Sequence, residues 1–405
     1  MMLQKRYTFS RPPQFNPPQV ANTVAPQLGQ VGLSWPIPRD KPVEELIVRA
    51  TFQVVNGAAL TLLANGSQAA LDNILGVCRK FRVNRPTGSQ RPASTKVVDY
   101  RGIGLLEYCA NTGLNLDAAT LNAVALSQGA TIANGTWVRI VYRIPLVHPL
   151  IGEPLRERMC LPCHTWTESA TLEIDFEQAS NIYTNATAGV IGNLNIEVGV
   201  LRRDPVKALT DATLAAGGYI PCDLIESNFA IGVGIATEQR LPLAQAGKQL
   251  NVQFCHYLGG ASITRNVPDA VTTPGSESVI SYQENSNEKC KFIWSQLQTL
   301  NDYSRVRNSA SQTYSPAIGL PVAANTQYPV PASVMYDALS DSIGTDNQSA
   351  TEFGSVIDLD ALKAAGALAE FVFTPANVAT NGSTIYYGGH RVYGNLAGYA
   401  QLLAA

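Results

Sequence analysis

The stretch WVRIVYRI, from Trp137 to Ile144, predicts the fold most directly. Every second residue is apolar, and Arg139 and Arg143 stand between them. Successive side chains of a strand point to opposite faces, so a period of two predicts a strand with one buried face. The buried face would consist of Val138, Ile140, Tyr142 and Ile144.

The same period of two recurs along most of the chain. Asn-Gly pairs, which supply the positive φ angles of tight hairpins, stand at Asn56, Asn65, Asn134 and Asn381. The sequence lacks the strand-helix-strand alternation that would indicate a parallel sheet. It therefore predicts an all-β protein with antiparallel sheets. The other strand-like stretches are IVRATFQVV (47–55), TLEIDFE (171–177), LNIEVGV (194–200), NFAIGVGIAT (228–237), QLNVQFCHYL (249–258) and two runs in EFVFTPANVATNGSTIYYGGHRVY (370–393).

Length and order predict two domains. All-β domains rarely exceed about 250 residues, and the chain has 405. RDPVKALTDATLAAGG (203–218) has a capping Asp204, an early Pro205 and terminal glycines, which predict a connecting helix. Short helices are also predicted in 100–113 and 287–303. We expect two tandem eight-stranded jelly-roll β-barrels with a few short helices and a Pro-rich N-terminal arm. The predicted boundaries are an extended arm over 1–42, a first jelly roll over 43–202, a connecting helix or linker over 203–222 and a second jelly roll over 223–405.

Composition limits the classes of function. Charged residues make up 15% of the chain, below the roughly 25% of a typical soluble domain. Two long stretches, 118–138 and 308–336, contain no charged residue. Such surfaces suit permanent subunit contacts, although a chance run in a low-charge protein would look the same. The net charge of −2 gives no indication of a general nucleic-acid binder.

The N-terminus and the cysteines indicate where the protein folds. No apolar run of signal-peptide length follows the first residues, and the seven cysteines are an odd number scattered over a long chain. We therefore expect folding in a reducing cytoplasm, with no disulfide framework. The prolines of RPPQFNPPQ (11–19) exclude a helix or a central strand. With Lys5, Arg6 and Arg11 nearby, this segment is predicted to be a partner- or membrane-facing arm.

The motif CLPCH, Cys160 to His164, has the spacing of a c-type haem attachment site. Haem attachment needs an export compartment, and a zinc site would need a second pair of ligands that no other Cys-x-x-Cys supplies. We interpret the motif as buried thiols in a turn at Pro162 and predict no cofactor, no metal site and no catalytic residue.

EIDFE, Glu173 to Glu177, supports an alternative function. Retaining β-glucan hydrolases of the jelly-roll type place such acids on one concave strand, where alternation brings the carboxyl groups together. Glu173 would then be the nucleophile, Glu177 the acid/base, and Asp175 the residue that tunes them. An amphipathic strand with one face in solvent produces the same spacing.

The order of strands and turns resembles the double jelly-roll major capsid proteins of tectivirus-like bacteriophages, which are tailless, icosahedral and contain an internal membrane. The stretches that carry the resemblance are WVRIVYRIPLVHP (137–149), LPCHTWTESATLEIDFEQASNIYTNATAGV (161–190) and EFVFTPANVATNGSTIYYGGHRVYGNLAGY (370–399).

The resemblance implies a structural protein and not an enzyme. The chain would be a major capsid protein, a homotrimeric pseudo-hexagonal building block of an icosahedral viral shell around an internal membrane. Its partners would be itself, neighbouring trimers and vertex or minor capsid proteins, with the viral lipid membrane as a further candidate and no sequence-specific nucleic acid contact. It would be located in the virion capsid after assembly in the host cytoplasm. In this context Lys5, Arg6 and Arg11 would face lipid or a neighbouring protein.

Overall fold

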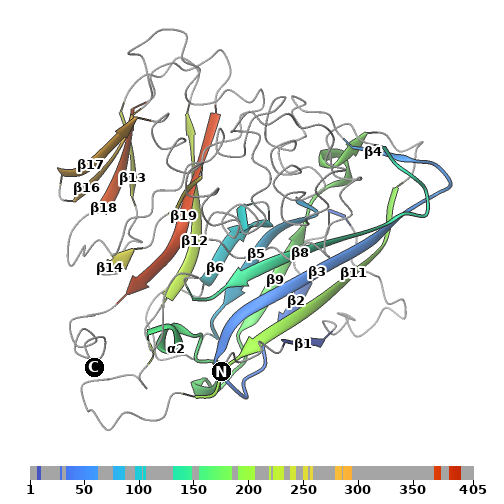
Figure 1. Ribbon diagram of the computed structural model, residues 1–405, viewed down its shortest axis with the longest axis horizontal. Coiled ribbons are helices and arrows are strands. Elements are labelled where there is room, and N and C mark those ends of the chain that lie inside the picture. Colours follow the sequence, from blue (N-terminus) through green and yellow to red (C-terminus); the bar gives the residue numbers. More distant parts are fainter. Residues whose placement is uncertain are drawn as a thin grey trace, which may run out of the picture.

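The structure is a computed structural model of the chain, and Figure 1 shows its strands arranged in two groups. It describes residues 7–10, 28–29, 33–62, 76–86, 96–102, 104–105, 131–147, 155–184, 190–205, 219, 222–231, 238–242, 250–253, 256–258, 279–284, 286–293, 369–374 and 383–393.

Two antiparallel layers form the first barrel. One layer has the strand order β1-β11-β3-β8 and the other the order β6-β5-β9-β2. Two four-stranded layers in this order make a jelly roll. The strands are β1 (Tyr7–Ser10), β2 (Leu33–Pro36), β3 (Val43–Val55), β5 (Cys78–Asn84), β6 (Lys96–Arg101), β8 (Trp137–Pro145), β9 (Thr171–Phe176) and β11 (Val190–Arg202). A small third sheet has the order β10-β4-β7, with β4 (Leu60–Leu62), β7 (Thr131–Ile132) and β10 (Tyr183–Thr184).

The burial of β8 confirms the predicted period of two, and two of the predicted Asn-Gly turns have positive φ angles. The four predicted core residues of β8 are fully buried, whereas Trp137 is 52% exposed and Arg139 is exposed. The turn at Asn56 and Gly57 has positive φ angles at both residues, and Gly135 has one as well. The backbone N–H of Gly57 donates to the side chain of Asn134, so the two Asn-Gly turns lie together.

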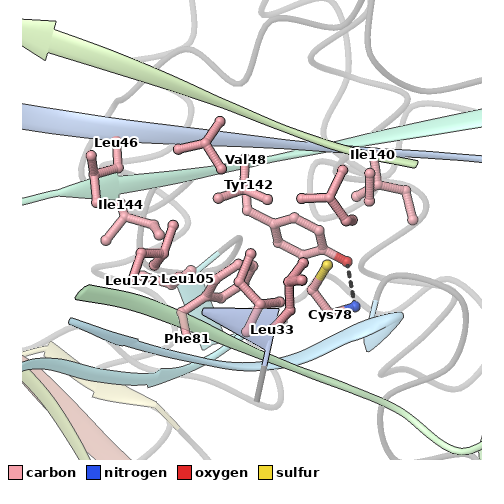
Figure 2. Packing of buried hydrophobic residues seen from close by; sticks show 14 of the residues in the cluster. Leu33, Leu46, Val48, Cys78, Phe81, Leu105, Ile140, Tyr142, Ile144 and Leu172 are labelled. Carbon is pink, nitrogen blue, oxygen red and sulfur yellow. Dashed lines mark hydrogen bonds between the residues drawn. The ribbon is translucent and has the colours of Figure 1, made fainter. Parts of the chain in front are cut away.

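The core of the first barrel lies between its two layers, as Figure 2 shows. Tyr142 crosses from β8 toward the opposite layer, where its ring packs on Phe81 with the centroids 5.0 Å apart. Its hydroxyl accepts a hydrogen bond from the backbone N–H of Cys78 at 3.3 Å. The bond satisfies a buried donor that would otherwise lack a partner in the core.

The segment predicted as an arm contributes two strands to this barrel. Tyr7 of β1 pairs with Leu201 of β11, and Leu33 of β2 pairs with Ile174 of β9. Each strand lies at the end of a layer, and the prolines of 11–19 follow β1 without entering it. The prediction of an extended arm over 1–42 did not include these strands. The domain boundaries themselves stay predictions.

The second barrel repeats the order of the first. Its layer β13-β18-β16-β17 corresponds to β2-β9-β5-β6, and β12 pairs with β19 as β1 pairs with β11. β14 and β15 both pair with the other edge of β19. The strands are β12 (Cys222–Ile231), β13 (Gln239–Pro242), β14 (Leu250–Gln253), β15 (His256–Leu258), β16 (Val279–Glu284), β17 (Asn287–Ile293), β18 (Ala369–Thr374) and β19 (Ser383–Tyr393).

The predicted helices require two corrections. Tyr100 and Arg101, which the prediction placed at the start of a helix over 100–113, are the last residues of β6. The helix predicted over 287–303 is wrong for residues 287–293, which form β17, because a turn at Ser286 with a positive φ folds this segment back onto β16. The cross-strand partners override the helical spacing of the apolar residues. Most of the predicted helix over 203–218 lies outside the described residues. The short helices that have described bounds are α2 (Leu155–Met159), η4 (Cys163–Thr165) and η5 (Ala179–Asn181).

Candidate functional site

The acidic stretch of β9 forms the strand that its period predicted, but its carboxylates are engaged. Asp175 has a fully buried side chain and forms an ion pair with Arg82, whose Nη1 lies 3.4 Å from Oδ1. Arg79 approaches the same carboxylate at 3.7 Å. Both arginines come from β5, the neighbour of β9. Asp175 therefore serves as the buried counter-ion of two arginines.

The two outer acids are held by different groups. Glu173 lies 3.5 Å from Nη1 of Arg82. Glu177 accepts hydrogen bonds at 2.8 Å from the backbone N–H of Gln178 and from the side chain of Asn181, which fold the following turn around it. A retaining hydrolase needs two carboxyl groups that face one substrate. The alternative of a glucan hydrolase is not supported by this arrangement.

CLPCH lies in a buried turn. Cys160 and Cys163 are both buried, and burial raises the pKa of the Cys163 thiol to about 12. The ring of His164 packs edge-on against Tyr219 with the centroids 5.5 Å apart. Among the described residues, no three His, Cys, Asp or Glu side chains are grouped so that they could hold a metal ion. The turn thus packs the first barrel against the segment that leads into β12.

A cluster of ion pairs lies at the end of the first barrel where β3 begins. Glu44 is buried and accepts hydrogen bonds from Arg156 at 2.9 and 2.6 Å and from Arg203. Burial alone would raise the pKa of Glu44, but the two guanidinium groups outweigh it and lower the pKa below its usual 4.5. The carboxylate connects α2 and the end of β11 to β3.

A seam joins the two barrels, and we use this word for the contact of β6 with β12 and the side chains that flank it. The two strands run parallel, with Leu224 opposite Val98 and Ile225 opposite Asp99. Through this pair, one layer of each barrel joins the same eight-stranded sheet. The sheet runs from β2 to β14. In Figure 1, β6 and β12 lie side by side between the two groups of strands.

A buried ion pair marks the beginning of β12 at the seam. Nη2 of Arg85 lies 2.7 Å from Oδ1 of Asp223, and the two side chains are 7% and 0% exposed. Removing one partner of such a pair leaves an uncompensated charge in a medium of low polarity. Removal of either partner is therefore expected to destabilise the contact between the barrels.

A second ion pair lies further along the seam. Glu226 accepts hydrogen bonds from the backbone N–H and Nε of Arg101, both at 3.0 Å, and from Nη2 at 3.1 Å. A Cβ atom at Gly104 would lie 2.5 Å from this carboxylate, and one at Gly102 would lie 1.9 Å from the carbonyl oxygen of Cys78. Gly104 of the motif RGIG therefore lies against a side chain of the seam, whereas Gly102 is required by the backbone of β5 within the first barrel.

A histidine adds a third polar contact between the barrels. Nε2 of His390, on β19, lies 2.9 Å from the carbonyl oxygen of Pro145 at the end of β8. Sequence reasoning missed the whole set of seam residues. The available signal was Asp223 and Glu226 within the otherwise apolar start of β12, since buried acids need partners.

The residues predicted for the arm, Lys5, Arg6 and Arg11, lie outside the described residues. Two of them directly precede Tyr7 in the sequence, and one directly follows Ser10. Within the part of the chain that the structure describes, no helix has the length and apolar character needed to cross a membrane.

The fold defines a class: the chain is an all-β double jelly-roll protein with few helices, in which a buried seam joins the barrels. No protein-family model matches it, and neither does any curated protein. Several solved structures, however, match this chain. The crystal structure of STIV MCP matches 99% of this chain and 100% of its own, with 13% identity and a TM-score of 0.55. A chain in the atomic structure of Sulfolobus Turreted Icosahedral Virus matches 94% of this chain and 90% of its own, with 15% identity and a TM-score of 0.54. At these identities the likeness concerns the fold.

Proposed function

We propose that this chain is a viral major capsid protein that works as a building block of an icosahedral shell. The observation that carries the proposal is a likeness of fold over the full length of STIV MCP, the major capsid protein of a turreted icosahedral virus. The match includes both barrels and leaves no part of that chain for an additional domain.

The seam gives the proposal a physical mechanism. A shell subunit has to present its contact surfaces at a constant angle, and a continuous sheet with buried ion pairs holds two barrels more firmly than a linker would. Two rigidly coupled barrels per copy let a three-fold oligomer imitate six-fold symmetry. The block would tile a large surface with few kinds of contact.

The finer parts of the proposal concern the assembly. The functional unit would be a homotrimer with a pseudo-hexagonal outline, in the shell of a tectivirus-like bacteriophage with an internal membrane. Neighbouring trimers and vertex or minor capsid proteins would be its partners, and shells would assemble in the host cytoplasm. Lys5, Arg6 and Arg11 would face a neighbouring protein or anionic lipid.

The mass of the purified protein tests the proposal. Three copies of the 43.4 kDa chain amount to about 130 kDa, which static light scattering separates easily from a monomer. We expect a stable trimer with a hexagonal outline in negative-stain images of the same peak. A monomer at every concentration that can be measured would contradict the proposal.

A further inference from the structure

The seam uses one particular edge of each barrel. In the first barrel it uses β6, which ends the layer β2-β9-β5-β6. In the second barrel it uses β12, the partner of β19. The two barrels share one strand order. The first barrel therefore has a strand equivalent to β12, and the second barrel has a strand equivalent to β6. The counterpart of β6 is β17, and the counterpart of β12 is β1.

These two counterparts are end strands among the described residues. β17 ends the sheet β13-β18-β16-β17, and β1 ends the sheet β1-β11-β3-β8. An end strand presents backbone N–H and C=O groups along one edge, and such an edge readily accepts a strand from another chain. One copy therefore presents one edge of each kind, in different barrels.

We propose that β17 of one copy pairs in parallel with β1 of the next copy and so repeats the seam between chains. The proposal rests on the proposed trimer and names its contact surface. The contact is heterologous, because it joins two different edges, and three such contacts close a ring. Intrachain seams and interchain contacts then alternate around six barrels.

Charge supports the parallel orientation. Parallel strands bring their beginnings together, and the beginnings of β1 and β17 carry opposite charges. Lys5 and Arg6 directly precede β1, while Glu288 is the second residue of β17 and is exposed. Lys289 and Lys291 follow on β17, and in the register that places Thr8 beside Lys289 and Ser10 beside Lys291 both lysines have uncharged neighbours.

Charge reversal tests the proposal. Lys5→Glu with Arg6→Glu should weaken the trimer about tenfold or more in dissociation constant, because surface pairs contribute little singly and three contacts add. Glu288→Lys should weaken it as well. All three changes in one chain should restore the dissociation constant to within about threefold of the unmodified protein. Lys41→Glu is the control, since Lys41 is exposed, carries the same charge and lies on neither edge.

Cross-linking gives a second measurement that does not depend on charge. Cysteine pairs that join Thr8 or Ser10 to Lys289 or Lys291 cover neighbouring registers, and oxidation should produce covalent trimers on a denaturing gel. The unmodified protein under the same oxidant is the control. A protein that is trimeric by light scattering but shows neither cross-linking nor charge rescue would overturn this inference and leave the proposed function intact. A monomeric unmodified protein would overturn both.

Discussion

Asp223→Asn should weaken the seam selectively. The change keeps the size of the side chain but removes the negative charge beside Arg85, in a pair whose members are 0% and 7% exposed. Breaking a buried ion pair from one side costs about 3–5 kcal/mol. We expect the lower end, about 3 kcal/mol, because asparagine still accepts a hydrogen bond from the guanidinium group.

Hydrogen exchange measures this loss where it occurs. Global unfolding of a 405-residue chain of two barrels is not a two-state process, so the free energy of local opening is the better quantity. A loss of about 3 kcal/mol accelerates exchange of the β6 and β12 amides about a hundredfold. Asp204→Asn removes the same charge from the exposed pair with Lys41 and should leave exchange unchanged.

A double variant separates charge from packing. Arg85→Met with Asp223→Leu replaces the pair by apolar side chains and should recover most of the protection that Asp223→Asn loses. Exchange of the seam amides within about threefold of the unmodified protein in Asp223→Asn would refute the reasoning, because the ion pair would then not stabilise the seam.

Three further predictions concern the first barrel. Tyr142→Phe should lower the free energy of unfolding of this barrel by about 1–3 kcal/mol in urea, because the backbone N–H of Cys78 loses its partner. Cys163 should resist maleimide at pH 8 in the native state, since its buried thiol has a pKa raised to about 12, and should react after denaturation. Glu44 has a lower pKa in the folded than in the unfolded chain. At pH values between these two pKa values the unfolded chain therefore binds more protons. Its contribution to stability is present at pH 7 and should be lost as the pH falls below its usual pKa of 4.5, whereas Glu44→Gln should lack this part of the pH dependence.

Each of these predictions has a contradicting outcome. Equal unfolding free energies for Tyr142→Phe and the unmodified protein would mean that the hydroxyl contributes nothing. Peptide mapping that finds Cys163 modified as fast as a small free thiol would contradict its burial. Identical acid-unfolding profiles with and without Glu44 would mean that Arg156 and Arg203 do not stabilise this carboxylate.

Sequence patterns predicted those parts of the fold that depend on neighbouring residues. The alternation in 137–144 predicted β8, and the Asn-Gly pair at Asn56 predicted the turn that follows β3, because burial on one face and a positive φ are local requirements. The four-residue runs of β1 and β2 are too short to display a period. Asn287–Ile293 was misinterpreted because apolar residues at helical spacing also fit a strand that pairs with β16.

The candidate site depended on contacts between distant residues, and the sequence could not reveal these. Arg85 and Asp223 are 138 positions apart, and no spacing rule connects a pair of that kind. For EIDFE the strand was predicted correctly, but Arg79 and Arg82 of β5 decide that Asp175 is a counter-ion. The motif alone does not reveal which side chains of a neighbouring strand form ion pairs with its acids.

Electron cryo-microscopy of the purified oligomer at side-chain resolution tests the central claim most directly. We predict six barrels around a three-fold axis, with β6 and β12 paired in parallel within every copy and Arg85 in contact with Asp223. Barrels of one chain that take variable angles to each other, or a particle without three-fold symmetry, would contradict it.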